Sequence, residues 1–268
     1  VIPVEFTYVV PTYKSGAENK SYAVLKQIID AGKTVMTHGK EEATMVRIDP
    51  AIGLNEWYKD ENGTDVLVST KRNEGGFIHI VNALNVDEGK RSTFEADMVI
   101  TGTVMLDGDE EKGTQDKLLV KGCIFNFANR LMPVEFSVLN PNGIKYFENL
   151  DATPNTPVFT KVWGRQVNET IITKVVEESA FGDSQVRETK KERKDWVITG
   201  TSTVQYEFDT EGVLTAQELK DAMSAREIHL AEMLQKQKEY QQSLDDAKEK
   251  LEELNDIPYA DRTSEQQH

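Results

Sequence analysis

Aromatic and basic side chains interleave in a short stretch of the sequence, a pattern that suits binding to a flexible anionic polymer. In residues 158–165, alternate positions carry Phe159, Lys161, Trp163 and Arg165, and the positions between them are small or aliphatic. Because successive side chains of a β-strand point to opposite faces, one face of such a strand combines rings with cations. Exposed rings stack on nucleic-acid bases at about 1–3 kcal/mol each, while cations follow the phosphates. The pattern therefore predicts a surface for single-stranded nucleic acid.

A second stretch, residues 118–127, repeats this chemistry. One face of the expected strand is apolar, and the other carries Lys121, Phe125 and Phe127 around Cys123. The predicted nucleic-acid-binding residues of both stretches, with four further rings and cations that extend the surface, are Lys71, Arg72, Phe77, Lys121, Phe125, Phe127, Arg130, Phe159, Lys161, Trp163 and Arg165. An alternative stays open, because a single alternating strand also fits rings buried under a second sheet, with the cations at strand ends.

Residue patterns of common enzyme sites are missing from the sequence. It has no Gly-rich phosphate loop ending in Lys-Ser/Thr and no pair of histidines at zinc-binding spacing on a helix. The acidic run 107–111 does not match a calcium loop, which needs ligands at defined positions and a distal Glu. Cys123 lies in a strand pattern and is expected to be a core thiol. We expect a binding protein that is not an enzyme, without catalytic residues, metal or cofactor.

Net charge argues against simple coating of DNA. Lys and Arg number 31 and Asp and Glu 46, which gives a net charge of −15. Nucleic-acid affinity normally comes from positive charge, so binding requires a local basic face on an acidic body. The same charge fits a different class of protein, an acidic inhibitor that mimics DNA and blocks a host nucleic-acid enzyme.

The elements that position these residues are mostly short strands. Residues 4–10 have strand composition, and residues 21–31 predict a short helix capped by Ser21. Short β-type runs with Gly and Pro punctuation then continue for about two hundred residues, which predicts a sandwich or barrel. Asn73-Glu-Gly-Gly lies between two such runs and predicts a hairpin turn.

One motif occurs twice in this β-rich part. Asp97-Met-Val-Ile-Thr-Gly-Thr103 and Asp195-Trp-Val-Ile-Thr-Gly-Thr201 differ at a single position. They are either equivalent strands of two related barrels or two strands of similar composition. The body, residues 1–213, is accordingly expected to be one unit or two subdomains that meet near residues 104–116.

A long helix is predicted for residues 214–257, with a disordered tail at 258–268. Thr215-Ala-Gln-Glu218 forms a capping box, and no Gly or Pro interrupts the sequence before Pro258. An apolar stripe at alternating three- and four-residue steps includes Met223, Leu230, Met233, Tyr240, Leu244 and Leu251, with Gln237 as a polar exception. Such a coiled-coil stripe predicts a helical partner, either a second copy in a homo-oligomer or another protein. A structural protein that assembles through this helix is the second functional alternative.

Targeting signals are not evident. No run of about 18 apolar residues is present, so no membrane span is expected. The first residues lack the basic and apolar regions of a signal peptide. We expect a cytoplasmic protein, in the host cytoplasm if the source is viral.

The same residues carry a family resemblance. Lys121-Gly-Cys-Ile-Phe-Asn-Phe127, Pro133-Val-Glu-Phe-Ser-Val138 and Asn155-Thr-Pro-Val-Phe-Thr-Lys-Val-Trp-Gly-Arg165 resemble OB-fold single-stranded DNA-binding proteins of phages that infect Gram-positive bacteria. The resemblance implies a five-stranded Greek-key barrel whose concave face binds single-stranded DNA. Together with the helices predicted above, the expected fold is mainly β (α+β), with one or two OB-like Greek-key barrels, a short N-terminal helix and a long C-terminal helix. The resemblance also implies a role in phage DNA replication or recombination. The acidic C-terminal segment departs from the resemblance, because it is predicted to be helical.

Overall fold

The computed structural model describes residues 2–7, 9–84, 87–108, 115–177 and 185–256, and the side chains of these except 88, 169–193 and 253–256. The tail predicted at 258–268 and most of the acidic run 107–111 lie outside the described residues. The elements are α1 (Lys20–Ala31), α2 (Val35–Glu42), β1 (Val46–Glu61), β2 (Thr64–Ile80), the short 3-10 helix η1 (Glu88–Lys90), β3 (Thr93–Leu106), β4 (Lys117–Phe125), β5 (Leu131–Val138), α3 (Pro141–Glu148), β6 (Val158–Glu177), β7 (Gln185–Thr201) and α4 (Ala216–Asp256).

The fold is mixed α+β, with 40% strand and 31% helix. The helix content is therefore higher than the expected mainly β fold implies, because the structure contains α2 and α3 in addition to the two predicted helices. The chain forms two compact units, the first made of residues 1–54 and 71–216 and the second of residues 55–70 and 217–268.

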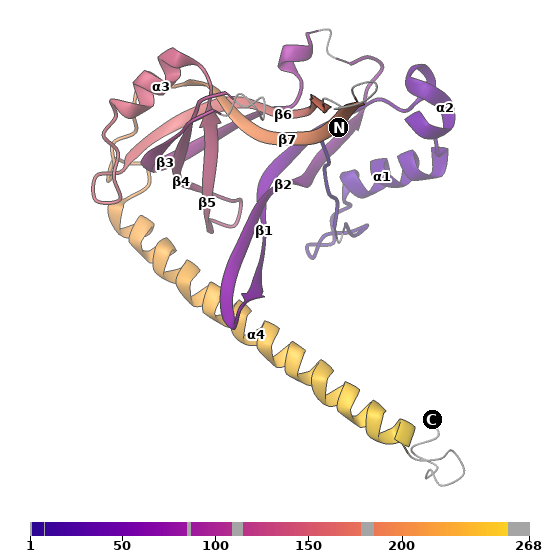
Figure 1. Ribbon diagram of the computed structural model, residues 1–268. Helices are drawn as coiled ribbons and strands as arrows, with labels where there is room; N and C mark the ends of the chain where they lie inside the picture. Colours follow the sequence, from indigo (N-terminus) through magenta and orange to yellow (C-terminus); the bar gives the residue numbers. More distant parts are fainter. Residues whose placement is uncertain (1, 8, 85–86, 109–114, 178–184, 257–268) are drawn as a thin grey trace. The chain divides into compact units, whose positions relative to one another are not determined.

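The first unit contains a closed barrel of five strands in the order β3-β4-β5-β7-β6 (Figure 1). Neighbouring strands are antiparallel except β5 and β7, which run parallel and meet at the single pair Ser137 and Val197. Helix α3 connects β5 to β6, and Asn140 caps it by accepting hydrogen bonds from the backbone N–H groups of Asn142 and Gly143.

Aromatic and aliphatic side chains on the inner face of the barrel form its core. Phe94, Phe136 and Trp196, from the first, third and last barrel strands, have ring centroids 4.8, 5.3 and 6.2 Å apart. Phe147 of α3 is buried with them. The apolar face predicted for residues 118–127 is confirmed, because Leu118, Val120 and Ile124 are buried in this core while Phe127 is exposed.

Both copies of the repeated motif lie in this one barrel, so the hypothesis of two related barrels is wrong. The copies are part of β3 and β7, and each bends closely over a glycine of a neighbouring strand. A Cβ atom at Gly122 of β4 would overlap the carbonyl oxygen of Val99, and one at Gly164 of β6 would overlap that of Val197. Val99 and Val197 occupy the same position of the motif, which therefore marks equivalent strand bends.

The predicted turn at Asn73-Glu-Gly-Gly is wrong, because β2 runs through it. The β1–β2 hairpin turns at Asn62-Gly63, where φ values of 57° and 82° match the two-residue turns that favour this dipeptide. Asn73 is buried and donates hydrogen bonds to Gln166 (2.9 Å) and the carbonyl of Pro3 (3.0 Å). Gly76 permits a close approach instead, since a Cβ atom there would overlap the Asp49 carbonyl oxygen.

The expected short N-terminal helix is α1, but its cap is Asn19 rather than Ser21. The Asn19 side chain accepts hydrogen bonds from the backbone N–H groups of Ser21 and Tyr22 (3.1 and 3.4 Å), and Gly32 ends the helix in the left-handed conformation. Over the part of the chain that the structure describes, no helix combines the length and apolarity that a membrane span requires.

In the second unit, α4 packs against the tip of the β1–β2 hairpin, and the predicted long helix is confirmed. Arg226 forms a bidentate ion pair with Glu56 at 2.5 and 3.2 Å, and both side chains are largely buried. The amide of Gln237 accepts from the backbone N–H of Tyr58 (3.1 Å) and donates to its carbonyl (2.6 Å). Gln237, the polar residue of the otherwise apolar stripe, therefore binds the backbone of β1.

The other residues of the stripe differ in exposure along the helix. Leu230 and Met233 are half-buried, and Met223 is exposed. Beyond Gln237 the stripe continues with Tyr240, Leu244 and Leu251, which are 65%, 37% and 57% exposed. A helical partner for this distal stripe stays a prediction.

Candidate nucleic-acid interface

The outer face of β6 carries the four interleaved residues that the sequence singles out. Thr160 and Val162, between them, are completely buried in the barrel, so Phe159, Lys161, Trp163 and Arg165 project outward. Trp163 is 41% exposed, and its indole lies against Gly200 of β7, where any side chain would overlap the ring. Because Gly200 has no side chain, the Trp163 ring can pack directly on the backbone of β7 while part of the ring stays accessible to solvent.

Phe159 is covered by the segment that follows β7. Its ring packs on Tyr206 and Phe208 at centroid distances of 4.8 and 5.8 Å, and its carbonyl accepts from the backbone N–H of Tyr206 (2.8 Å). The Tyr206 hydroxyl donates to Asp97 at 2.9 Å, and this hydrogen bond raises the tyrosine pKa. For Phe159, the alternative of a ring covered by other parts of the chain therefore describes the structure better than an open platform.

Lys161 and Lys121 both have acidic partners across the strands. Lys161 pairs with Glu95 of β3 at 2.7 Å, and the hydrogen bond to Glu95 raises the pKa of the lysine. Lys121 pairs with Glu135 of β5 at 3.2 Å. Next to Lys121, Cys123 is buried as expected, and burial raises the pKa of its thiol to about 11. These two lysines are partly neutralised within the barrel.

Two of the residues added from β2 are also engaged. Lys71 is half-buried; its ammonium donates to the carbonyl of Glu135 and lies 5.6 Å from the Phe136 ring centroid. Burial lowers the pKa of Lys71, against the opposing effect of nearby carboxylates. Arg72 pairs with Glu74 at 2.8 Å and with Glu5 at 3.4 Å. Phe77 is 66% exposed.

The loop between β4 and β5 presents an aromatic ring on a rigid turn. The Asn126 side chain accepts hydrogen bonds from the backbone N–H groups of Ala128 and Arg130, both at 2.9 Å. This turn leaves Phe127 fully exposed, while Phe125 behind it is half-buried. An exposed ring on a hydrogen-bonded turn can stack on a base with little loss of conformational entropy.

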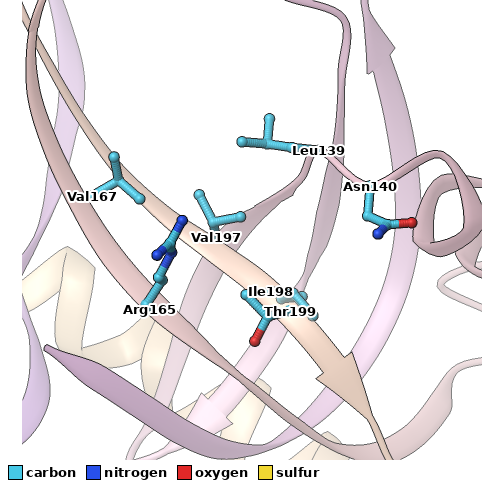
Figure 2. A pocket seen from close by; sticks show the side chains of 7 residues that line it. All are labelled: Leu139, Asn140, Arg165, Val167, Val197, Ile198 and Thr199. Atoms are coloured by element: carbon cyan, nitrogen blue, oxygen red, sulfur yellow. The ribbon is translucent and has the colours of Figure 1, made fainter. Parts of the chain in front are cut away.

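A groove runs along β7 beside Arg165. Figure 2 shows Arg165 and Val167 of β6 on one side, and Leu139 and Asn140 after β5 on the other. Its volume is about 220 Å³, and Val197, Ile198 and Thr199 form the floor. A second hollow of about 320 Å³ shares Asn140, Ile198 and Thr199 with this groove and extends along α3 to Gly200.

Two arginines of the predicted set make no ion pair within the described part of the chain. These are Arg130 and Arg165, and both are exposed. Each lies close in sequence to an exposed ring, Arg130 to Phe127 and Arg165 to Trp163. The structure therefore retains two aromatic–arginine pairs as candidates for stacking and phosphate contact, and engages most of the other predicted residues in the protein itself.

Sequence reasoning missed a larger cleft, with a volume of about 870 Å³. It is lined by the start of β1, the start of β3 and the core rings Phe94 and Trp196. Two of its cations have acidic partners, since Arg47 pairs with Asp49 (3.3 Å) and Lys90 with Asp87 (3.8 Å). Its residues come from seven separate segments of the sequence, so no local pattern predicts it. Among the described side chains, no three His, Cys, Asp or Glu residues are grouped to hold a metal ion.

These features define a mixed α+β protein with a closed five-stranded barrel and exposed aromatic–arginine pairs on its surface. By sequence, the chain belongs to the YorF family, whose model matches residues 4–238. No curated protein matches the sequence. No solved structure matches it.

Proposed function

We propose that the barrel is an OB-fold and that the protein binds single-stranded DNA in replication or recombination, without catalysing a reaction. The topology supports the fold assignment: five strands form a closed Greek-key barrel, with the third and fifth strands parallel and a helix between the third and fourth. Barrels of this kind recurrently bind oligonucleotides.

The observation that carries the proposal is the pairing of Trp163 with Arg165 beside an open groove. The indole offers one face for stacking, which is indifferent to base identity. The Arg165 guanidinium, two residues along the strand, is exposed and available to a phosphate oxygen. Phe127 with Arg130 repeats this arrangement on the β4–β5 loop. A flexible single strand can present bases and phosphates to such pairs, whereas the bases of a duplex stay stacked inside it.

Substitution of Trp163 tests the proposal against a matched control. Trp163→Ala is expected to weaken oligo-dT binding roughly 5- to 150-fold, the equivalent of about 1–3 kcal/mol for one stacked base. Trp57→Ala is the control, because Trp57 lies in the second unit and is equally exposed, 40% against 41%. A mobility-shift titration with single- and double-stranded DNA measures both. Equal losses in the two variants, or no loss in either, would contradict the proposed face.

The exposed distal stripe of α4 favours a second function, assembly through the helix. Tyr240, Leu244 and Leu251 form an apolar strip on an otherwise charged helix. If the protein assembles through this helix, the double variant Leu244→Glu and Leu251→Glu is expected to lose the defined oligomer in sedimentation experiments. DNA binding is expected to stay intact. The DNA-mimic hypothesis, in contrast, requires that the protein bind no DNA, so the titration above also separates it from our proposal.

A further inference from the structure

The segment between β7 and α4 covers part of the candidate interface. Residues 203–208, the strap, run beside β6 and bridge to it at Phe159. The Tyr206 N–H donates to the Phe159 carbonyl (2.8 Å), and the rings of Tyr206 and Phe208 pack on the Phe159 ring. Trp163, the next ring on the same face of β6, is exposed. The strap therefore prevents a base from stacking on one of the two rings of this face.

Few contacts hold the strap on the barrel. Among the described residues, two hydrogen bonds join the strap to the barrel, and both come from Tyr206: the N–H bond to β6 and a bond from the hydroxyl to Asp97 (2.9 Å). No residue of the strap is buried, and Val204 is 70% exposed. The turn that follows has hydrogen bonds of its own, such as that from the Val213 N–H to the Thr210 carbonyl (2.9 Å). The strap can thus leave β6 without unfolding of the turn or of β7.

Charge distinguishes the covered face from the uncovered one. Residues 202–214 contain no Lys or Arg and three acids, Glu207, Asp209 and Glu211. Glu207 lies in the strap between the two covering rings and is exposed. A phosphate that approaches the covered face is therefore repelled by the strap. When the strap leaves, the same face presents the Phe159 ring, with Lys161 two residues along the strand.

We infer that the strap is an autoinhibitory cover of the single-strand site, and that bound DNA displaces it and stacks a base on Phe159. The inference rests on the proposed function and deepens it by naming how the same site is regulated. In the covered state, the part of the site on β6 consists of Trp163 and Arg165. In the uncovered state, the site extends along β6 to Phe159, so that the strand offers two rings for stacking.

Removal of the covering rings is expected to strengthen binding. A protein whose binding-competent state is populated at about 1–10% binds with an affinity reduced by about 10- to 100-fold. The double variant Tyr206→Ala and Phe208→Ala removes the cover and changes no charge, so it is expected to bind oligo-dT at least about 10-fold more tightly in a mobility-shift titration. Val204→Ala with Gln205→Ala is the matched control, because both side chains belong to the strap and are exposed. The control is expected to bind as the unmodified protein does.

A third variant identifies the ring that is uncovered. Adding Phe159→Ala to the double variant removes the ring on which the additional base stacks. The affinity is expected to fall about 5- to 150-fold below that of the double variant, which corresponds to the loss of one stacked base. If the double variant binds no more tightly than the unmodified protein, or if Phe159→Ala leaves its gain unchanged, the strap is not a cover.

Amide hydrogen exchange tests the displacement in the unmodified protein. Saturating oligo-dT is expected to speed exchange of the Tyr206 N–H, because its bond to Phe159 is broken. The Gln166 N–H, which donates to the Ser92 carbonyl (2.8 Å), is expected to stay protected. Slower or unchanged exchange at Tyr206 in the complex would overturn the cover while single-strand binding stands. If neither the unmodified protein nor the double variant binds oligo-dT at low salt, both the cover and the proposed function are wrong.

Discussion

Replacing Gly164 with alanine is expected to destabilise the barrel by about 3 kcal/mol or more, and the same change at Gly122 is expected to do so to a similar degree. At each position the new Cβ atom would overlap a backbone carbonyl oxygen, that of Val197 or Val99. A backbone atom in a paired strand cannot move aside as a flexible side chain can. Relief of the overlap therefore requires the strands to separate at the bend, with loss of neighbouring hydrogen bonds. Urea unfolding of the full chain measures the loss.

Gly102 provides the matched control for these two glycines. It also lies in a barrel strand, but the nearest atom to a Cβ placed there is the Ala152 carbonyl oxygen at 4.0 Å. Gly102→Ala is expected to change the free energy of unfolding by less than about 1 kcal/mol. Normal stability of Gly164→Ala and Gly122→Ala would mean that β3 and β7 do not bend over these glycines as described.

The second large effect is expected at the buried ion pair of the second unit. Arg226→Ala leaves the Glu56 carboxylate without its partner in a site where both side chains are largely buried, 14% and 13% exposed. Removing one member of a buried pair typically costs about 3–5 kcal/mol, because the remaining charge is desolvated and unpaired. We expect the hairpin tip to detach from α4 in this variant. Amide hydrogen exchange at Tyr58, whose N–H is bonded to Gln237, measures the detachment.

A double variant separates the ion pair from simple packing. Arg226→Met with Glu56→Met removes both charges and retains apolar contact, so it is expected to be much more stable than Arg226→Ala. Lys238→Ala serves as the exposed control, since its pair with Asp65 is 62% and 36% exposed and is worth less than about 1 kcal/mol. Equal exchange at Tyr58 in the Arg226 and Lys238 variants would show that the buried pair does not hold the hairpin.

Strand alternation was sufficient to predict which side chains of β4 and β6 enter the barrel, because that depends only on local geometry. It was insufficient to predict which cations stay available. The partners of Lys161 and Lys121 are Glu95 and Glu135, and only the registers of β3 with β6 and of β4 with β5 bring them together. Register is a long-range property, so the sequence could not show that these two lysines are paired within the barrel.

The main error in the predicted fold is the hairpin turn at Gly75 and Gly76. A pair of glycines between two β-type runs predicts a turn, yet Gly75 and Gly76 lie within β2, where other backbone and ring atoms approach closely. The turn itself lies at Asn62-Gly63, a dipeptide that favours two-residue hairpin turns. Local sequence cannot distinguish a glycine needed for positive φ from one needed for close contact, because the contacting atoms come from distant segments.

The helical stripe illustrates the same limit. Its spacing correctly predicted a long helix with one contact face, but helical spacing alone does not reveal what lies on that face. Arg226 and Gln237 bind a β-hairpin of the same chain, through a side-chain carboxylate and a strand edge. The exposed stripe residues, Met223, Tyr240, Leu244 and Leu251, remain accessible to another molecule.

The aromatic trio in the barrel core has a consequence for the order in which the chain becomes stable. Phe94, Phe136 and Trp196 belong to the first, third and last barrel strands, so the trio is incomplete until more than a hundred residues after Phe94 have been synthesised. During that interval, the first three strands carry two large rings without their third partner. Distant closure of this kind slows folding and leaves apolar surface exposed. A nascent chain that ends before Trp196 is therefore the species most in need of a chaperone.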